Sequence, residues 1–502
     1  MSESASRGGG TATVPGSAPP PAPERPRRLA GPRRWLSETV EFVYRLAGST
    51  LATPKVALGI SLAGLVLIMV VGILSPNFNT LPPNHTNDPT LLKPIILPLS
   101  GHLWTLPWWL SFPLTYLAIV LQCLGLAGLL WANSRGWRPN PRHLLLAAVV
   151  IVAIMVNITP VGSSDEASYA AYGRMANYGI DPYSNGPQAL GEANPYSLVV
   201  GPMWTNTPSV YGPLGTWVQQ LAAWLGGSSP SSTVHYQMIF NGIVFLAVGL
   251  FLLKVADDPV RATLMWVANP VLIQQLVAGG HLDTYTAAAT VVGVQLARRG
   301  TNNWRYLAVG AAIGVACDFK INAALVGLGV GWALLMKREW LNIVRLAVGG
   351  FGVVVAGYAF YGLHALLQVF AGSSLTATPS PWRALQLTLQ GVFSLFGDEH
   401  LGIVIGSTLT TILWPILTAL CAMVIYRRIS PDQPAVITVP FALCFAWVVV
   451  APWALPWYAA LAWVIVAMMP RNPMTRWLTL FTVFLALMHS SGGGPAPWAN
   501  SN

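Results

Sequence analysis

An acidic pair directly follows an apolar stretch of the sequence, a position where carboxylates are unusual. Asp165 and Glu166 open the segment SSDEASYAAYGRMANYGIDPYSNGP, in a chain with only 17 Asp and Glu among its 502 residues. A carboxylate held beside a membrane span can act as a general base toward a hydroxyl group that reaches it from the membrane surface. We therefore take Asp165 and Glu166 as candidate catalytic residues.

The residues from Asp165 onward have the spacing of a helix with one polar and aromatic face. Asp165, Tyr169 and Tyr172 recur at intervals of four and three residues, which places them on the same side of an α-helix. A carboxylate above two rings suits a sugar, since the carboxylate accepts a hydroxyl proton and the rings stack. A capping role is the alternative, because Ser163 and Glu166 have the S-x-x-E spacing of a capping box. Capping explains Glu166 better than it explains Asp165.

Two turn-rich segments follow this predicted helix. GIDPYSNGP (residues 179–187) and PSVYGPLG (residues 208–215) are rich in Gly and Pro, which favours rigid turns. Asp181 suits the initiation of a turn, and we favour that role for it. Tyr183 and Tyr211 are candidates for contacts with an acceptor sugar, with a purely structural role in the turn as the alternative.

Two further breaks between apolar stretches hold polar side chains. Gly279 and Gly280 interrupt the sequence VAGGH, so that His281 and Asp283 can point into one cavity and hold a phosphate or a hydroxyl. The alternative for these two is a solvated helix end. Lys320 separates two apolar stretches of near-minimal length and is a candidate for binding a phosphate, with snorkelling toward lipid headgroups as the alternative.

The remaining candidates lie in the second half of the chain. Arg383, in PSPWR, is a further candidate phosphate ligand. Residues 398–400 (Asp, Glu, His) imitate a metal cluster, but spacings of one or two residues in a loop are poor grounds for one, and we predict no metal site. Trp457 and Tyr458, in PWY, suit a stacking platform for an acceptor sugar or an interfacial aromatic belt.

The composition requires that these residues be held by membrane-spanning helices. The chain is 54% hydrophobic and 9% charged, with a mean hydropathy of +0.55, whereas an average soluble domain is roughly one quarter charged. Four cysteines lie in or beside apolar stretches without metal-binding spacing, which indicates packing rather than redox chemistry. The net charge of +10 is best explained by loops that face anionic lipid rather than by nucleic acid. We predict an all-α polytopic membrane protein with about 11–15 transmembrane helices and short external helices.

The positive charges alternate along the connections between about thirteen apolar stretches. Connections predicted to be internal carry most of the cations, which are Arg135, Arg138, Arg142, Lys254, Arg261, Arg298, Arg299, Arg305, Lys337, Arg338, Arg427, Arg428, Arg471 and Arg476. Connections predicted to be external carry only Lys93, Arg174, Lys320 and Arg383. This bias predicts a cytoplasmic N-terminus and a candidate site on the extracytoplasmic face of the plasma membrane.

The domain organisation follows from the same pattern. We predict a disordered basic cytoplasmic tail over residues 1–50 and a single transmembrane catalytic bundle over residues 51–490. The bundle contains an external catalytic segment, residues 161–233, and a second external loop, residues 365–400. A flexible C-terminal tail occupies residues 491–502.

The order of the motifs resembles a known family, the actinobacterial polyprenol-phosphomannose-dependent α-1,6-mannosyltransferases of the C-type glycosyltransferase (GT-C) superfamily. The resemblance covers roughly residues 145–470. The motifs that carry it, in order, are Asp165-x-x-x-Tyr169, DPY (181–183), YGPL (211–214), ANP (268–270), VAG-x-H ending at His281, Lys320 and PWY (456–458).

The resemblance implies a GT-C-like fold and an inverting transfer of mannose from polyprenyl-phosphate mannose. The acceptor would be the 6-hydroxyl of a growing lipid-anchored mannan of the cell envelope, such as lipomannan. Asp165 matches the family's proposed general base, while an acid at the position of Glu166 is not always found there. Lys320 and His281 match positions near the donor phosphate. We add Arg383 and Tyr169 as donor-binding candidates, and the acceptor-binding candidates are Tyr183, Tyr211, Asp283, Trp457 and Tyr458.

The expected partners are a polyprenyl-phosphate sugar donor, a lipid-anchored glycan acceptor and membrane lipid, without nucleic acid. The chemistry requires no cofactor, and a divalent metal is left open. The sequence has no P-loop and no G-x-G-x-x-G motif, which argues against a nucleotide-sugar donor. Two alternatives remain: a C-type transferase that uses another polyprenyl-phosphate sugar such as arabinose, and a lipid-linked sugar transporter or flippase. A transporter would place polar residues along a path through the midplane.

Overall fold

The computed structural model describes residues 38, 53–74, 106–299, 302–371, 375–377 and 380–489. The chain divides into two compact units, Met1–Phe42 and Val43–Asn502, and the helices described below belong to the second unit. The described residues form helices and no strand, which confirms the all-α prediction. The predicted N-terminal tail, apart from Glu38, and the predicted C-terminal tail lie outside the described residues.

Five of the described helices are long and apolar enough to cross a membrane. They contain 19 to 28 residues, or about 28–42 Å at 1.5 Å per residue, against a hydrocarbon core of about 30 Å. These helices are α2 (Pro54–Leu74), α3 (Trp108–Ser134), α8 (Pro230–Val255), α14 (Trp340–Tyr358) and α17 (Glu399–Tyr426). Shorter apolar helices accompany them: α4 (Pro141–Met155), α13 (Ala324–Met336), α18 (Ala435–Val450), α19 (Ala460–Ala467) and α20 (Met474–His489). The prediction of a polytopic membrane protein is confirmed.

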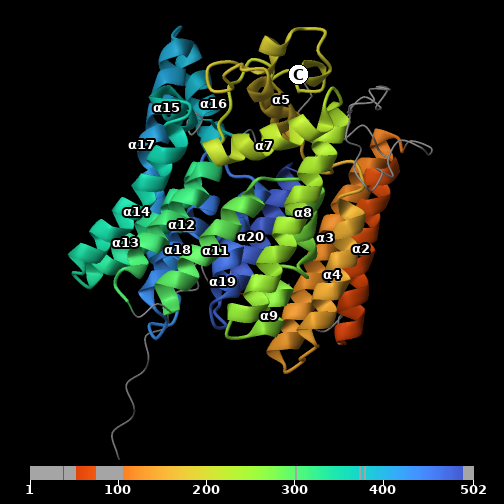
Figure 1. Ribbon diagram of the computed structural model, residues 1–502, viewed down its shortest axis with the longest axis vertical. Coiled ribbons are helices and arrows are strands. Elements are labelled where there is room, and N and C mark those ends of the chain that lie inside the picture. Colours follow the sequence, from red (N-terminus) through yellow and green to blue (C-terminus); the bar gives the residue numbers. More distant parts are fainter. Residues whose placement is uncertain are drawn as a thin grey trace, which may run out of the picture. The chain divides into compact units, whose positions relative to one another are not determined.

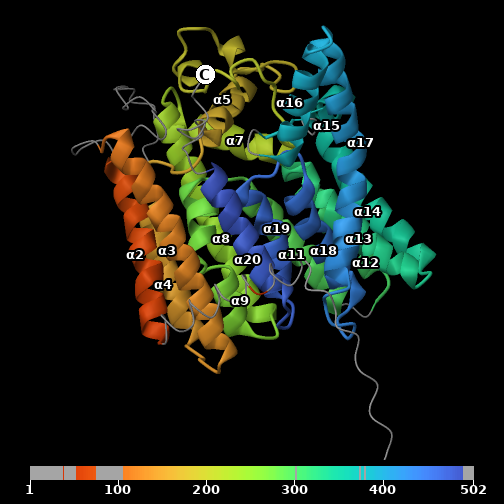
Figure 2. The same ribbon diagram turned by 180° about the vertical axis from the view of Figure 1, so that it is seen from behind.

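The long helices are held together through small residues. In Figures 1 and 2, α2, α3 and α4 run side by side, and α8 lies next to them. On the other side of the unit, α12 (Arg305–Phe319) packs along α14. A Cβ atom at Gly310 would lie 2.0 Å from the Leu346 carbonyl oxygen, and one at Gly349 would lie 2.0 Å from that of Leu307. The two backbones therefore approach closely only because glycine stands at both positions.

The mostly apolar residues 262–279, which we counted as one of the thirteen predicted stretches, do not form one continuous helix in the structure. Helix α9 (Pro259–Met265) ends before Asn269, and α10 (Pro270–Leu272) leads into a π-helix, η3 (Ile273–Ala278). The Asn269 side-chain oxygen accepts hydrogen bonds from the amides of Val271 (3.1 Å) and Leu272 (3.3 Å), which restarts the helix after the break. The turn that follows contains Gly280 at φ +64°, a conformation that favours glycine.

Residues 161–233, predicted as an external catalytic segment, contain short helices that gather at one end of the second unit (Figure 1). They are α5 (Asp165–Asn177), η2 (Pro187–Leu190), α6 (Pro195–Leu198) and α7 (Pro213–Gly226). Residues 365–400, predicted as the second external loop, contain the end of α15 (Leu363–Ala371) and all of α16 (Pro381–Ser394). Figure 1 shows α5, α7, α15 and α16 at this end and α9 at the opposite one. We call them the α5 end and the α9 end.

Candidate active site

Asp165 is the first residue of α5, and Ser163 and Tyr169 contact its backbone and its carboxylate, respectively. The hydroxyl of Ser163 accepts a hydrogen bond of 3.1 Å from the Asp165 amide, which fixes the start of the helix. The Tyr169 hydroxyl lies one turn further on, 3.5 Å from Asp165 Oδ2, as the helical spacing predicted. The Asp165 side chain is 23% exposed, so a reactant can still approach it.

His281 lies against the same carboxylate oxygen from a different segment of the chain. Its Nδ1 is 3.6 Å from Asp165 Oδ2. The imidazole stacks on Trp457, with ring centroids 3.6 Å apart and planes 12° apart. The His281 carbonyl accepts a hydrogen bond of 2.8 Å from the Asn241 side chain of α8. These contacts hold a buried imidazole beside the acid, and the Gly280 turn before it makes this placement possible.

Lys320 forms a buried ion pair with Asp283, the first residue of α11 (Asp283–Arg299). The ammonium Nζ lies 2.8 Å from Asp283 Oδ2 and 3.1 Å from Oδ1, and the two side chains are only 9% and 2% exposed. The same nitrogen lies 3.6 Å from the centre of the Tyr458 ring. An ammonium group has three N–H donors, so two carboxylate oxygens and one aromatic face account for all of them.

Tyr211 connects the acid and the lysine. Its ring packs edge-on against Tyr169, with centroids 4.9 Å apart and planes at 87°, and Lys320 Nζ lies 5.9 Å from its centre. The next residue, Gly212, donates its amide to the Phe319 carbonyl at 3.2 Å. A Cβ atom at Gly212 would lie 2.3 Å from the carbonyl oxygen of Asp318. The YGP turn and the lysine turn are thus packed backbone to backbone, which brings Tyr211 into the cluster.

The environment of Asp165 raises the pKa of its carboxyl group toward neutral pH. Burial raises the pKa of Asp165 from 3.8 to about 6, with the Lys320 charge opposing the rise and the Asp283 charge adding to it. A carboxyl group of this kind is mostly ionised at pH 7 and still accepts a proton more readily than an ordinary aspartate. Such a perturbed acid next to a buried cation is a common property of catalytic sites.

Glu166, the second predicted catalytic acid, points elsewhere. Its side chain is fully buried, and a Cβ atom at Gly280 would lie 2.9 Å from Glu166 Cγ. The helix begins one residue later than a capping box from Ser163 requires, and its N-cap, Ser164, forms no side-chain capping hydrogen bond. The structure therefore places Glu166 against the turn that carries His281, one position around the helix from Asp165.

The predicted residues in the DPY turn and in α16 are not joined to this cluster by the described contacts. Tyr183 is buried, with its hydroxyl 2.9 Å from that of Thr216 and its ring edge-on to Tyr361. Asp181 accepts a hydrogen bond of 3.0 Å from the Tyr183 amide, as expected of a turn residue. Arg383 is exposed in the first turn of α16.

Residues 398–400 have structural roles at the start of α17. Asp398 caps the helix by accepting a hydrogen bond of 2.9 Å from the Leu401 amide. Glu399 accepts a hydrogen bond of 2.6 Å from the Gln390 side chain. Among the described residues, no group of three His, Cys, Asp or Glu side chains is placed to hold a metal ion.

Two features of the cluster were missed from the sequence. Asp283 was expected at the acceptor, whereas the structure pairs it with Lys320. Asn241 and Trp447 were not considered, although Trp447 stacks on Tyr458 with centroids 5.3 Å apart. The amide of Asn241 inside the long apolar helix α8 was the available signal for it, since polar groups in such helices usually have a specific partner.

Comparison with known proteins identifies relatives of this chain. A family model described as "Alpha-(1->6)-mannopyranosyltransferase, N-terminal domain" matches residues 62–336. Alpha-(1->6)-mannopyranosyltransferase A of Corynebacterium glutamicum is 30% identical over 186 residues, which are 36% of this chain and 37% of that protein. Alpha-(1->6)-mannopyranosyltransferase B of the same organism is 28% identical over 279 residues, or 50% and 46%. Alpha-(1->6)-mannopyranosyltransferase A of Mycobacterium tuberculosis is 26% identical over 335 residues, 62% of each chain. Each match spans less than two thirds of the relative's length, and no solved structure matches significantly.

Proposed function

The chain belongs to the alpha-(1->6)-mannopyranosyltransferase family, and on that premise we propose that it is an integral-membrane α-1,6-mannosyltransferase that uses polyprenyl-phosphate mannose. The observation that carries the proposal is the meeting of Asp165, His281 and Lys320 in one cluster from three separate segments. A partly open acid beside a buried cation suits the transfer of a sugar from a phosphate leaving group.

Asp165 is the general base of the proposed reaction. The acceptor hydroxyl gives its proton to the Asp165 carboxylate while its oxygen attacks the anomeric carbon of mannose. A base positioned in this way typically contributes about a hundred- to ten-thousand-fold to the rate. The pKa of about 6 supports this role, because the group is ionised at neutral pH and remains a competent proton acceptor.

Lys320 is the proposed partner of the leaving group. The bond between the anomeric carbon and the phosphate oxygen breaks as the new bond forms, and its electron pair stays on the phosphate. A nearby fixed cation stabilises this growing charge. Inversion at the anomeric carbon then gives an α-linked product from a β-linked donor.

The ion pair with Asp283 sets a condition on donor binding. Because the three N–H donors of Lys320 already face Asp283 and the Tyr458 ring, the phosphate must displace one of these partners or share a donor. The Tyr458 ring is the weaker partner, since a cation–π contact is worth about 0.5–2 kcal/mol. We therefore expect the phosphate to approach from the side of Tyr458.

Two ring systems in the cluster suit the sugars. Trp457 stacks on His281 beside the base, and Tyr169 and Tyr211 form an edge-on pair between the base and the lysine. Aromatic faces of this kind bind the apolar faces of sugar rings. Of the acceptor-binding candidates, Trp457, Tyr458 and Tyr211 therefore fit the proposal better than Tyr183 does.

The α5 end is the extracytoplasmic end in this proposal. The distribution of arginines supports that orientation, because positive residues concentrate on the cytoplasmic side of membrane proteins. At the α9 end, Arg138 pairs with Asp258, and Arg298 and Arg299 pair with Asp257. A lipid-borne donor would then meet the base at the headgroup level.

The direct test is an assay of the full chain in membranes. Radiolabelled mannose on polyprenyl phosphate is offered together with a dimannoside acceptor, and the linkage of the product is determined. We expect a trimannoside with a new α-1,6 bond. Polyprenyl-phosphate arabinose serves as the parallel donor, and transfer of arabinose without mannose would overturn the donor assignment. Donor movement across the membrane without any product would instead identify a flippase.

A further inference from the structure

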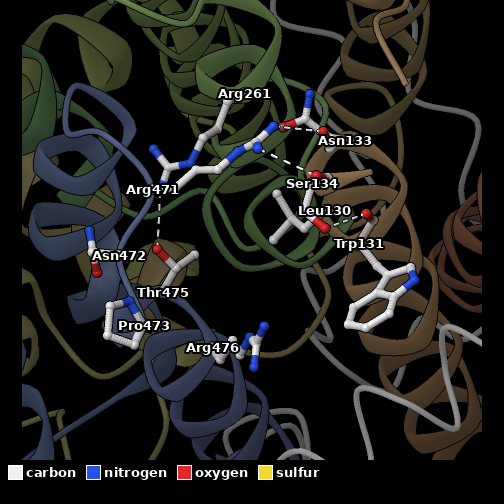
Figure 3. A pocket seen from close by; sticks show the side chains of 10 residues that line it. All are labelled: Leu130, Trp131, Asn133, Ser134, Arg261, Arg471, Asn472, Pro473, Thr475 and Arg476. Atoms are coloured by element: carbon white, nitrogen blue, oxygen red, sulfur yellow. Dashed lines mark hydrogen bonds between the residues drawn. The ribbon is translucent and has the colours of Figure 1, made fainter. Parts of the chain in front are cut away.

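A second cavity lies at the α9 end, far from the candidate active site. It has a volume of about 370 Å³ and is lined by the last turn of α3, the start of α9 and the segment that leads into α20. Its described lining residues are Leu130, Trp131, Asn133, Ser134, Arg261, Arg471, Asn472, Pro473, Thr475 and Arg476. Figure 3 shows the Arg261 and Arg471 guanidinium groups close together on one wall and Arg476 on another. We call this cavity the arginine pocket.

The arginine pocket and the Asp165 cluster lie toward opposite ends of helix α8. Near its start, Met238 approaches the Gly280 turn, where a Cβ atom would lie 2.8 Å from the methionine sulfur. The helix has 26 residues, which is about 39 Å at 1.5 Å per residue, and α9 follows its far end. Figures 1 and 2 show α5 and α9 at opposite ends in both views. The pocket is therefore no part of the proposed transferase site.

Arg261 forms the floor of the pocket, and its guanidinium group donates hydrogen bonds to neutral groups. Its side chain is 4% exposed and donates to the carbonyls of Val466 (3.1 Å) and Met469 (2.6 Å) and to the Thr475 hydroxyl (3.1 Å). These partners satisfy N–H donors without adding a negative charge. The arginine is thus fixed in place, and its charge is compensated in part by the nearby Asp258 carboxylate.

Arg471 repeats this pattern at the rim. Its guanidinium donates to the carbonyl of Asn133 (2.7 Å) and approaches that of Ser134 (3.4 Å), at the end of α3. None of the described lining residues is acidic. The nearby carboxylate of Asp258 instead binds the Arg138 guanidinium at 2.7 Å and the Arg261 backbone amide at 3.0 Å. Two fixed guanidinium groups therefore face one cavity without an acid between them.

The two walls of the pocket differ in character. Arg471 and Arg476 are exposed, so they can meet a ligand at the opening. Leu130 and Trp131 belong to α3, which is a candidate membrane span, and they give the pocket one apolar side. Guanidinium groups bind phosphate oxygens in pairs of parallel hydrogen bonds, which makes arginine the preferred residue for phosphate recognition.

We propose that the arginine pocket binds the phosphate group of an anionic ligand. The ligand chemistry is a phosphate ester or a free phosphate, held by Arg471 and Arg476 at the opening, with the charge of Arg261 beneath it. A phospholipid with an anionic headgroup and a soluble phosphate compound share this chemistry. This inference does not depend on the proposed mannosyl transfer.

The test is native mass spectrometry of the full chain in detergent with three separate probes. These probes are phosphatidylglycerol, phosphatidylcholine and inorganic phosphate. We expect the wild-type chain to bind phosphatidylglycerol at least tenfold more tightly than phosphatidylcholine if the source is a lipid headgroup. Binding of inorganic phosphate without a preference for phosphatidylglycerol would identify a soluble phosphate compound as the source, and it would support the pocket equally.

The variants decide whether the binding occurs in this pocket. Arg476→Gln and Arg471→Gln should each weaken binding of the preferred probe about fivefold or more, and Arg476→Lys should retain part of it. Arg142→Gln removes an exposed arginine from α4 at the same end, outside the pocket, and should leave the affinity within twofold. Thermal unfolding without ligand checks that each variant is folded. Equal affinities for Arg476→Gln and Arg142→Gln, or no preference of the wild-type chain for any phosphate probe over phosphatidylcholine, would overturn the proposal.

Discussion

The two ends of the molecule use charge in opposite ways. At the α5 end, Lys320 and Asp283 are almost completely buried, and one aromatic ring covers the ammonium group. At the α9 end, Arg138 and Asp258 form a pair of similar length, but their side chains are 49% and 27% exposed. The first pair is held in a medium of low polarity, where each charge depends on its partner. In the second pair, water can readily take the place of either charged partner.

The two pairs therefore differ in how much each contributes to the stability of the folded protein. Removing one member of a buried pair leaves an uncompensated charge and costs about 3–5 kcal/mol, whereas an exposed pair is worth about 0–1 kcal/mol. We expect the Lys320–Asp283 pair to serve the candidate site rather than stability, because well-packed apolar residues are often at least as stabilising as a buried pair. The positions that govern activity should therefore be concentrated at the α5 end.

The largest expected effect is the loss of the base. Asp165→Asn should lower the rate of sugar transfer about a hundred- to ten-thousand-fold, because the amide cannot accept the hydroxyl proton. The rate is measured with the radiolabelled donor, and binding of the donor lipid is measured separately. Glu192→Gln is the matched control, since it makes the same chemical change at an exposed acid of the segment 161–233. Comparable rates for the two variants would remove Asp165 from the mechanism.

The second effect concerns stability. Asp283→Asn should destabilise the protein by about 3–5 kcal/mol, since it leaves Lys320 buried and charged without its partner. Arg138→Gln at the α9 end should cost less than about 1 kcal/mol. Thermal unfolding in detergent compares them. The double variant Asp283→Ala with Lys320→Ala should cost less than the sum of its single variants, and strict additivity would contradict a direct pair.

The third effect is on the pH dependence of activity. With the pKa of Asp165 at about 6, the transfer rate should fall roughly tenfold per pH unit below that value, as the base becomes protonated. Lys320 lowers this pKa and Asp283 raises it. The acidic limb should therefore move to higher pH in Lys320→Met and to lower pH in Asp283→Asn. A limb that stays fixed in both variants would assign the titration to another group.

Ionisation of Asp165 should also affect folding with a defined sign. The folded protein holds this proton more tightly than the unfolded chain does, because its pKa is raised from 3.8 to about 6. Protonation of Asp165 therefore stabilises the folded state at low pH. This stabilisation is lost as the pH rises from 3.8 to about 6. Asp165→Asn should remove this part of the pH dependence.

The smallest effect tests the aromatic cover over the buried cation. Tyr458→Leu removes the ring that faces Lys320 and should cost about 0.5–2 kcal/mol through the lost cation–π contact. Tyr458→Phe keeps a ring in place and should remain close to the wild-type protein. The apparent unfolding temperature distinguishes them. An equal loss in both variants would show that the hydroxyl group, rather than the ring, stabilises this position.

Local patterns predicted the parts of the fold that depend on neighbouring residues. The helix from Asp165, the placement of Tyr169 one turn above it and the break at Gly280 each follow from a few adjacent residues, and the structure has all three. The membrane character follows from composition alone. The catalytic and binding roles of these residues stay predictions.

Tertiary contacts account for what the sequence did not reveal. The pairing of Asp283 with Lys320 joins positions 37 residues apart, and no local pattern selects that partner over a sugar hydroxyl. The break before Asn269 lies in a mostly apolar stretch, where hydropathy gave no sign of it, although the Asn269-Pro270 dipeptide favours a turn. Helix α16 was not predicted within the external segment 365–400, although Pro381 is well placed in the first turn of a helix.

The enclosure of the Lys320 ammonium group has a consequence for chemical labelling. An amine whose N–H groups are all engaged, and which is 9% exposed, should resist acylating reagents. Lys254 and Lys337 are exposed and should be modified quickly. A donor phosphate that draws the amine away from the Tyr458 ring would change the labelling rate of Lys320 alone. The labelling rate of Lys320 would thus report whether the donor is bound. Peptide mapping measures this rate without any assay of product.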